Sequence, residues 1–284
     1  MFPQLFDPAK LRKGIDKFVD GIVTDYGDSL GALSDHFERW LAWFEKLLRT
    51  APWWSVVLAV IVIAWLLTRR IGLSLLMGGL LCIIGLLGLW DAGMQTLALM
   101  LMATFLSVII GIPVGILMGR LDWVRAVLHP VLDIMQTMPS FVYLIPVVML
   151  FGLGKTPALI ATIIYAVAPL IRLTDLGIRL VDKEVLEASR AYGANAWQQL
   201  FGVQIPLALP NIMAGINQTT MMALAMVVIA SMIGATGLGQ EVLQGINRLE
   251  VGRGLMAGVS IVVLAILFDR ITQAYGRRQR RGAH

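Results

Sequence analysis

The residues Glu187-Ala188-Ser189, then Gly193, then Val203-Gln204-Ile205-Pro206 stand in a polar stretch that runs from Leu173 to Pro210 between two apolar segments. Within it, residues 183–191 favour a helix, and residues 196–201 can form a second one. Gly193 lies between the two pieces, where glycine lets the chain turn without steric cost. The stretch is therefore predicted to form a pair of short helices outside the membrane, with a surface suited to docking a partner.

The rest of the chain is too apolar for a soluble protein. Of its 284 residues, 58% are hydrophobic and 14% are charged, and the mean hydropathy is +0.79. In soluble domains about a quarter of all residues are charged. This chain has fewer, so lipid must solvate its surplus apolar side chains. The basic residues lie beside apolar segments, which fits an anionic membrane surface better than a nucleic-acid groove.

We predict an all-α integral membrane protein with about seven transmembrane helices. Seven apolar segments are long enough, or nearly so, to cross about 30 Å of hydrocarbon as helices. They cover residues 52–68, 71–90, 95–118, 130–151, 157–172, 211–234 and 255–271. The fifth segment is short and contains Pro169, so a bent or buried helix is expected there.

The distribution of basic residues predicts that the amino terminus lies outside the cell and the carboxy terminus in the cytosol. In that orientation the outer loops between helices hold Lys155, Arg248 and Arg253. The inner segments and the tail hold many more: Arg69, Arg70, Arg120, Arg125, Arg172, Arg179, Lys183, Arg190, Arg270, Arg277, Arg278, Arg280 and Arg281. Basic residues of the amino-terminal tail would also lie outside, which weakens the bias.

The amino-terminal tail contains an amphipathic segment, in which apolar residues recur at steps of three and four: Leu30, Leu33, Phe37, Trp40, Leu41, Phe44 and Leu48. This helix either lies in the outer membrane interface or packs against the other helices. The predicted organisation is an extracytoplasmic tail with this helix (1–51), two peripheral transmembrane helices (52–90), a core (91–271) containing the cytosolic stretch 173–210, and a basic cytosolic tail (272–284).

The polar stretch resembles the signature loop of binding-protein-dependent ABC importer permeases. That loop reads Glu-Ala-Ala, three residues, Gly, nine residues, then Ile-x-Leu-Pro; here Ser189 replaces the second Ala, and Val203 and Ile205 replace Ile and Leu. The resemblance implies a type I ABC importer permease architecture. It also implies that the loop couples the permease to an ATPase through Glu187, Ala188, Ser189, Gly193, Val203, Ile205 and Pro206.

Further strings resemble the subfamily that imports glycine betaine, proline betaine, choline or carnitine. These are residues 136–146 (Gln-Thr-Met-Pro-Ser-Phe-Val-Tyr-Leu-Ile-Pro), 215–224 (Gly-Ile-Asn-Gln-Thr-Thr-Met-Met-Ala-Leu) and 233–239 (Ile-Gly-Ala-Thr-Gly-Leu-Gly). In this subfamily a separate binding protein recognises the quaternary ammonium group through an aromatic cage. We therefore assign no high-affinity substrate residues to this chain.

Six polar residues within apolar spans are candidates for lining a translocation path: Gln136, Thr137, Asn217, Gln218, Thr219 and Thr220. Hydrogen bonding between helices is the alternative role for them. Asp133 is expected near the cytosolic start of its span as an interfacial carboxylate. Gly111, Gly115 and Gly119 recur at every fourth position, which predicts close packing of two helices.

Several features exclude other functions. Gly152-Leu153-Gly154-Lys155-Thr156 lacks the first glycine of a phosphate-binding loop, because Met149 stands at that position. Cys82 is the single cysteine, and His36, His129 and His284 lie far apart, so the sequence offers no metal-ligand spacing. We expect no cofactor, no metal and no enzymatic activity in this chain.

The resemblance implies a permease subunit of a bacterial inner-membrane importer for quaternary ammonium osmolytes. Its partners would be two cytosolic ABC ATPase subunits that bind ATP and Mg²⁺, a second permease copy, an extracytoplasmic substrate-binding protein and membrane lipid, without nucleic acid. An ABC permease for amino acids is the first alternative. A secondary transporter or channel is the second, although the predicted spans place no ionisable residue deep in the membrane. A membrane scaffold without transport activity is the third.

Overall fold

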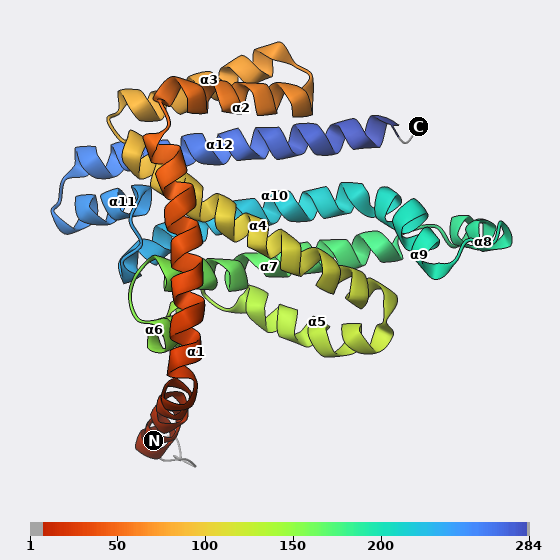
Figure 1. Ribbon diagram of the computed structural model, residues 1–284, viewed down its shortest axis with the longest axis horizontal. Coiled ribbons are helices and arrows are strands. Elements are labelled where there is room, and N and C mark those ends of the chain that lie inside the picture. Colours follow the sequence, from red (N-terminus) through yellow and green to blue (C-terminus); the bar gives the residue numbers. More distant parts are fainter. Residues whose placement is uncertain (1–7, 283–284) are drawn as a thin grey trace, which may run out of the picture.

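The computed structural model describes residues 8–282, and the elements of this range are helical, which confirms the predicted all-α class (Figure 1). The α-helices are α1 (Pro8–Thr50), α2 (Trp53–Thr68), α3 (Ile71–Leu86), α4 (Trp90–Arg120), α5 (Asp122–Thr137), α6 (Leu144–Phe151), α7 (Lys155–Arg179), α8 (Lys183–Ala191), α9 (Ala196–Gln199), α10 (Ile205–Ala230), α11 (Leu238–Asn247) and α12 (Val251–Gly282). Short turns connect some of them: the 3₁₀ turns η1 (Ser140–Tyr143) and η3 (Ser231–Ile233), and the π turn η2 (Leu200–Gln204).

Helix α7 lies at the centre of the bundle, between α4 and α10. The predicted glycine row of α4 faces it. A Cβ atom at Gly115 would lie 2.5 Å from Cβ of Thr174 and 2.8 Å from the carbonyl oxygen of Ile171. Gly111 and Gly119 approach Leu170 and Ile178 of α7 in the same way. The row therefore lets two helix backbones come into contact, as the sequence predicted.

The predicted count of seven transmembrane helices is not confirmed. Among the described residues, four helical stretches are long and apolar enough to cross a membrane, and two bent helix pairs raise the number to six. The four are 90–120 (α4), 155–179 (α7), 196–233 (α9 to η3) and 251–273 (within α12). Helix α3 is apolar, but with 16 residues it is shorter than these four stretches.

The predicted span 130–151 is wrong as a single helix. α5 begins at Asp122 and ends at Thr137, and the segment Ser140–Phe151 leaves it at an angle of 113°. Met138 has an extended backbone (ψ 134°), because the following Pro139 disfavours the helical conformation in the residue before it. The hydroxyl group of Tyr143 donates a hydrogen bond to the carbonyl of Met135 across this bend.

Two other predicted boundaries change. α7 continues to Arg179 and α10 begins at Ile205, so the segment outside these helices is shorter than the predicted 173–210. The sequence analysis also missed α11, a ten-residue helix that is too short and too polar to stand out as a span.

Helix α1 is longer than predicted and runs across the bundle, crosswise to the long helices α7 and α10 (Figure 1). Leu41 is 1% exposed, and Phe37, Phe44 and Leu48 pack against the main apolar core. Of the two predicted roles, packing against the other helices therefore holds for this face. Trp40 and Trp43 point away from the core and are exposed.

We expect Gly115→Val to destabilise the protein, since added side-chain atoms must push α4 away from α7. Overpacking of this kind costs about 1–3 kcal/mol. The measurement is the thermal unfolding midpoint of the detergent-solubilised protein. Gly79→Val in α3 is the matched control, because a Cβ atom there meets no heavy atom within 4 Å. Equal midpoints for the two variants would contradict the close packing at Gly115.

Candidate functional site

The two short helices α8 and α9 project from the bundle at the end opposite to α1 (Figure 1). Asp182 caps α8 by accepting a hydrogen bond from the backbone N–H of Glu184 (2.9 Å). Asn195 caps α9, and Gln198 bonds back to the N–H of Asn195 at 2.9 Å, which completes a capping box. Gly193 has a φ of +82°, so the predicted turn between the helices depends on a backbone conformation that favours glycine.

Gln199 braces the helix pair from inside. Its side chain is 5% exposed, and its Nε2 donates to the carbonyl of Leu186 (2.9 Å) and to Oγ of Ser189 (3.0 Å). Ser189 thus acts within the helix pair, as an acceptor for Gln199. Gln199 was not among the predicted site residues, and no motif marks it in the sequence.

The outer surface of the helix pair is aromatic. Tyr192 is 94% exposed, and Trp197 and Phe201 stack with their ring centroids 5.8 Å apart and their planes 10° apart. The predicted coupling residues Glu187, Ala188, Gly193 and Pro206 are also exposed, whereas Ser189, Val203 and Ile205 are partly buried. Two aromatic residues four positions apart in a polar stretch were a signal that the sequence analysis left unused. Exposed aromatic side chains of this kind are common anchors of protein interfaces.

The six candidate path residues divide into two groups. Thr219 is fully buried and donates to the carbonyl of Ala166 in α7 (2.8 Å), and Thr220 bonds to the carbonyl of Ile216. Asn217 donates to Asp269 of α12 (3.3 Å) and accepts from Thr272. These contacts favour a packing role for Asn217, Thr219 and Thr220. Gln136, Thr137 and Gln218 are exposed on the bundle surface.

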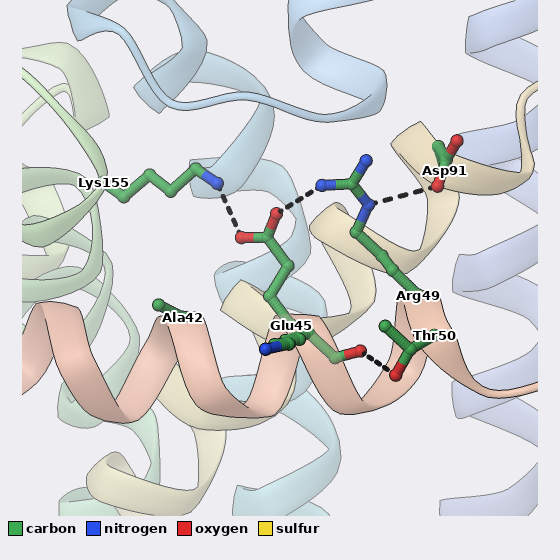
Figure 2. Close-up of a pocket in the computed structure, with 7 residues that line it drawn as sticks. Ala42, Glu45, Arg49, Thr50, Asp91 and Lys155 are labelled. Atoms are coloured by element: carbon green, nitrogen blue, oxygen red, sulfur yellow. Dashed lines mark hydrogen bonds and ion pairs between the residues drawn. The ribbon is translucent and has the colours of Figure 1, made fainter.

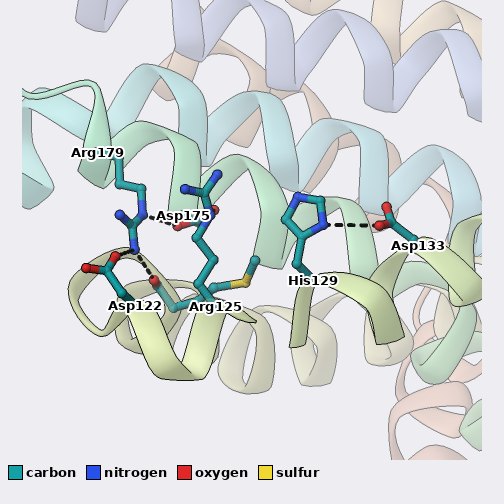
Figure 3. A network of polar contacts seen from close by, with 7 residues as sticks. Asp122, Arg125, His129, Asp133, Asp175 and Arg179 are labelled. Atoms are coloured by element: carbon teal, nitrogen blue, oxygen red, sulfur yellow. Dashed lines mark hydrogen bonds and ion pairs between the residues drawn. The ribbon is translucent and has the colours of Figure 1, made fainter. Parts of the chain in front are cut away.

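Charged residues join α5 to α7. Asp175 is 4% exposed and pairs with Arg179 (3.0 Å) and with Arg125 of α5 (3.4 Å), as Figure 3 shows. Further along α5, Asp133 pairs with Arg172 of α7 and with His129. These charged residues lie within helices because α7 extends past Arg172 and because α5 begins eight residues earlier than the predicted span.

A second ion-pair network fixes α1 to the bundle, and it lines a pocket of about 360 Å³ (Figure 2). Glu45 is 7% exposed and accepts from Lys155 at the start of α7 (2.6 Å) and from Arg49 (3.4 Å). Arg49 also contacts Asp91 at the start of α4 (3.1 Å). Lys155, the lysine of the rejected phosphate-loop sequence, thus binds a carboxylate of α1.

The other residues named in the sequence analysis are Cys82, the histidines and the arginines of the tail. Within residues 8–273, no group of three His, Cys, Asp or Glu side chains is placed to hold a metal ion. Cys82 is free and partly buried. The arginines of the tail, from Arg277 to Arg281, and His284 fall outside the residues whose side chains are described.

The chain belongs to the family of binding-protein-dependent transport system inner membrane components, which it matches over residues 111–281. It is therefore a membrane-embedded transport subunit, a permease of an importer that works with a binding protein. This confirms the family that the loop spacing predicted.

Curated relatives match nearly the whole chain. The glycine betaine/proline betaine transport system permease protein ProW of Escherichia coli (strain K12) is 46% identical over 95% of this chain and 76% of its own length. The glycine betaine transport system permease protein OpuAB of Bacillus subtilis (strain 168) is 44% identical over 91% of this chain and 92% of its own. An inward-facing structure of the MetNI methionine ABC transporter has the same fold, with a TM-score of 0.58 at 22% identity over 69% of this chain and 96% of that one.

Proposed function

We propose that this permease imports quaternary ammonium osmolytes such as glycine betaine, proline betaine, choline or carnitine. The observation that carries the proposal is the identity of 44–46% to two permeases that are named for glycine betaine, over more than nine tenths of this chain. The chain itself binds no ATP in this scheme. ATP and Mg²⁺ belong to a separate ATPase, and a binding protein delivers the osmolyte from outside.

The surface of α8 and α9 is the proposed ATPase dock. Its exposed aromatic residues Tyr192, Trp197 and Phe201 supply apolar area that an aqueous face would not otherwise carry. Two ATPase subunits and a second copy of the permease would give each ATPase one such dock. The translocation path would then lie between the two permeases.

The helix that carries the dock is continuous with a central helix of the bundle. Residues 196–233 form one helical stretch of 38 residues, which includes α9, η2 and α10. A push on Trp197 therefore reaches α10 without crossing a flexible joint. α10 contacts α7 and α12 through the hydrogen bonds of Thr219 and Asn217, so we infer that closure of the ATPases tilts these helices together.

The predicted orientation is supported by the placement of the amino-terminal helix and the predicted cytosolic segments near opposite ends of the bundle. The helix pair α8–α9 and the carboxy-terminal end of α12 lie at one end of the bundle, and α1 crosses near the other (Figure 1).

With Cys82 replaced by serine, we expect a cysteine at Asp28 to react with a membrane-impermeant thiol reagent added outside intact cells. A cysteine at Glu187 should react after the inner face is opened. Reaction of both from the same side would contradict the orientation.

Measurements of uptake into vesicles test which substrate the permease transports. Vesicles that contain the permease, its ATPase and its binding protein should accumulate radiolabelled glycine betaine when ATP is inside, and unlabelled betaines should compete. Uptake of an amino acid without competition from betaines or choline would favour the first alternative. Uptake without any ATPase would favour a secondary transporter.

Gly193→Asp should abolish coupling. Its φ of +82° is a conformation that other residues resist, and the new carboxylate would lie on the proposed dock. A loss of about 3 kcal/mol at the dock weakens ATPase binding more than a hundredfold. We expect uptake and binding-protein-stimulated ATP hydrolysis to collapse at normal protein levels in the membrane.

Gly21→Asp is the matched control for this variant. Gly21 lies in α1, far from the dock, and a Cβ atom there meets no heavy atom within 4 Å. This change should leave uptake near the wild-type rate. Wild-type uptake by Gly193→Asp would show that this turn does not transmit energy.

A further inference from the structure

Helix α5 has three distinct faces. One face packs on the bundle through Val124, Leu128, Leu132 and Met135, against a small cluster around Met118 and Ile171. A second face is apolar and exposed: Trp123, Val127, Val131 and Ile134. The third face is polar and half exposed, with Arg125, His129, Asp133 and Gln136 following one another at steps of three and four. This spacing puts the four polar side chains on one stripe of the helix.

The polar stripe continues along most of α5. His129, Asp133 and Gln136 lie about 10, 16 and 21 Å from the start of α5, at a rise of about 1.5 Å per residue. The side chains of His129 and Asp133 are 47% and 52% exposed. Charged side chains on the helices of a membrane protein face protein or water where the hydrocarbon would surround them, because lipid does not solvate them. The separate apolar face of α5 is available for lipid.

Arg172 of α7 gives this stripe an anion-binding group next to its carboxylate. One of its Nη atoms donates to Asp133, and the side chain is 28% exposed. Its Nε is buried and has no hydrogen-bond partner among the described residues. Among the described residues the guanidinium group makes no hydrogen bond other than the one to Asp133, so its remaining Nη donors can meet a second carboxylate.

We propose that Asp133 and Arg172, flanked by His129 and Gln136, form a charged station for a zwitterionic cargo in the translocation path. The carboxylate of Asp133 would meet the quaternary ammonium group, and the guanidinium group of Arg172 would meet the carboxylate of the cargo. In the empty path, Asp133 and Arg172 neutralise each other. When the cargo binds, this one ion pair is replaced by two: Asp133 with the ammonium group and Arg172 with the carboxylate of the cargo. The low cost of this exchange suits a site that must bind the cargo weakly and release it. The inference rests on the proposed function for the identity of the cargo.

Thiol reactivity tests which face of α5 meets water, independently of transport. In a Cys82→Ser background, Gln136→Cys and Ile134→Cys differ by two positions and lie on different faces. The probe is a trimethylammonium-bearing methanethiosulfonate reagent, applied to the reconstituted complex. We expect Gln136→Cys to react at least tenfold faster than Ile134→Cys, and excess glycine betaine to slow that reaction. Equal rates, or a faster reaction of Ile134→Cys, would overturn the proposal.

Charge variants test contact with the cargo. Asp133→Asn and Arg172→Gln should each lower the maximal rate of glycine betaine uptake about tenfold, the order of one charge-assisted contact. The control is Asp122→Asn, which removes the exposed partner of Arg179 at the start of α5 and should keep uptake within about twofold of wild type.

The charge swap Asp133→Arg with Arg172→Asp separates this role from a purely structural one. The swap keeps an ion pair between α5 and α7 but reverses the polarity that the cargo meets, so we expect uptake to stay low. Recovery to the wild-type rate would reduce the pair to a link between helices and overturn the proposal. If wild-type vesicles do not take up glycine betaine, the proposed function fails; if they do and both single variants match wild type, the inference alone fails.

Discussion

The backbone contact between α4 and α7 is the constraint on which the rest of the structure depends. Helices in a membrane gain no hydrophobic free energy by leaving lipid for one another, so they associate through close packing and hydrogen bonds. Gly111, Gly115 and Gly119 supply that packing over three successive turns of α4. On its other side, α7 meets α10 in the same manner, since a Cβ atom at Gly177 would lie 2.9 Å from Cβ of Asn211. The three helices thus form a rigid centre to which the other elements attach.

The peripheral elements attach to this centre in different ways. α5 contributes a small apolar cluster and two sets of ion pairs, while α1 is held by its apolar face and by Glu45. Ion pairs with one exposed member tolerate small displacements better than an interlocked glycine contact does, because a long side chain can follow its partner. The ion pairs therefore lie where the outer helices α1 and α5 contact the central helices, and the glycine contacts lie between the central helices themselves.

The sequence predicted those parts of the molecule that have a local signature. The glycine row, the turn at Gly193 and the apolar segments that became α2, α3, α4, α10 and α12 follow from spacing and composition. The bend after α5 did not, because a proline inside an apolar run fits a kinked span as well as a break. The extended backbone of Met138 produces the break; Pro139 favours that conformation but does not by itself exclude a kinked helix.

The site was less predictable than the fold, since its residues act through contacts that are distant in sequence. Thr219 and Gln136 are both polar residues in apolar runs, yet Thr219 meets the carbonyl of Ala166, while Gln136 is exposed. Gln199 gains its role from Leu186 and Ser189, ten or more positions away, and no motif marks it. Asp175 became a buried carboxylate because α7 continues past the point where its apolar composition ends.

The π turn between α9 and α10 connects the proposed ATPase dock to the three packed central helices. A π turn adds a residue to the helical turn, which rotates the side chains that precede it relative to those that follow. Leu200 and Gln204 of this turn are buried, so the junction is held by packing and does not act as a free hinge. Trp197 and Phe201 are exposed near the start of a continuous helical stretch, and Thr219, with its hydrogen bond to α7, lies further along the same stretch. If the aromatic pair is the ATPase dock, as we propose, a force applied there acts on a helical stretch that packs directly on α7.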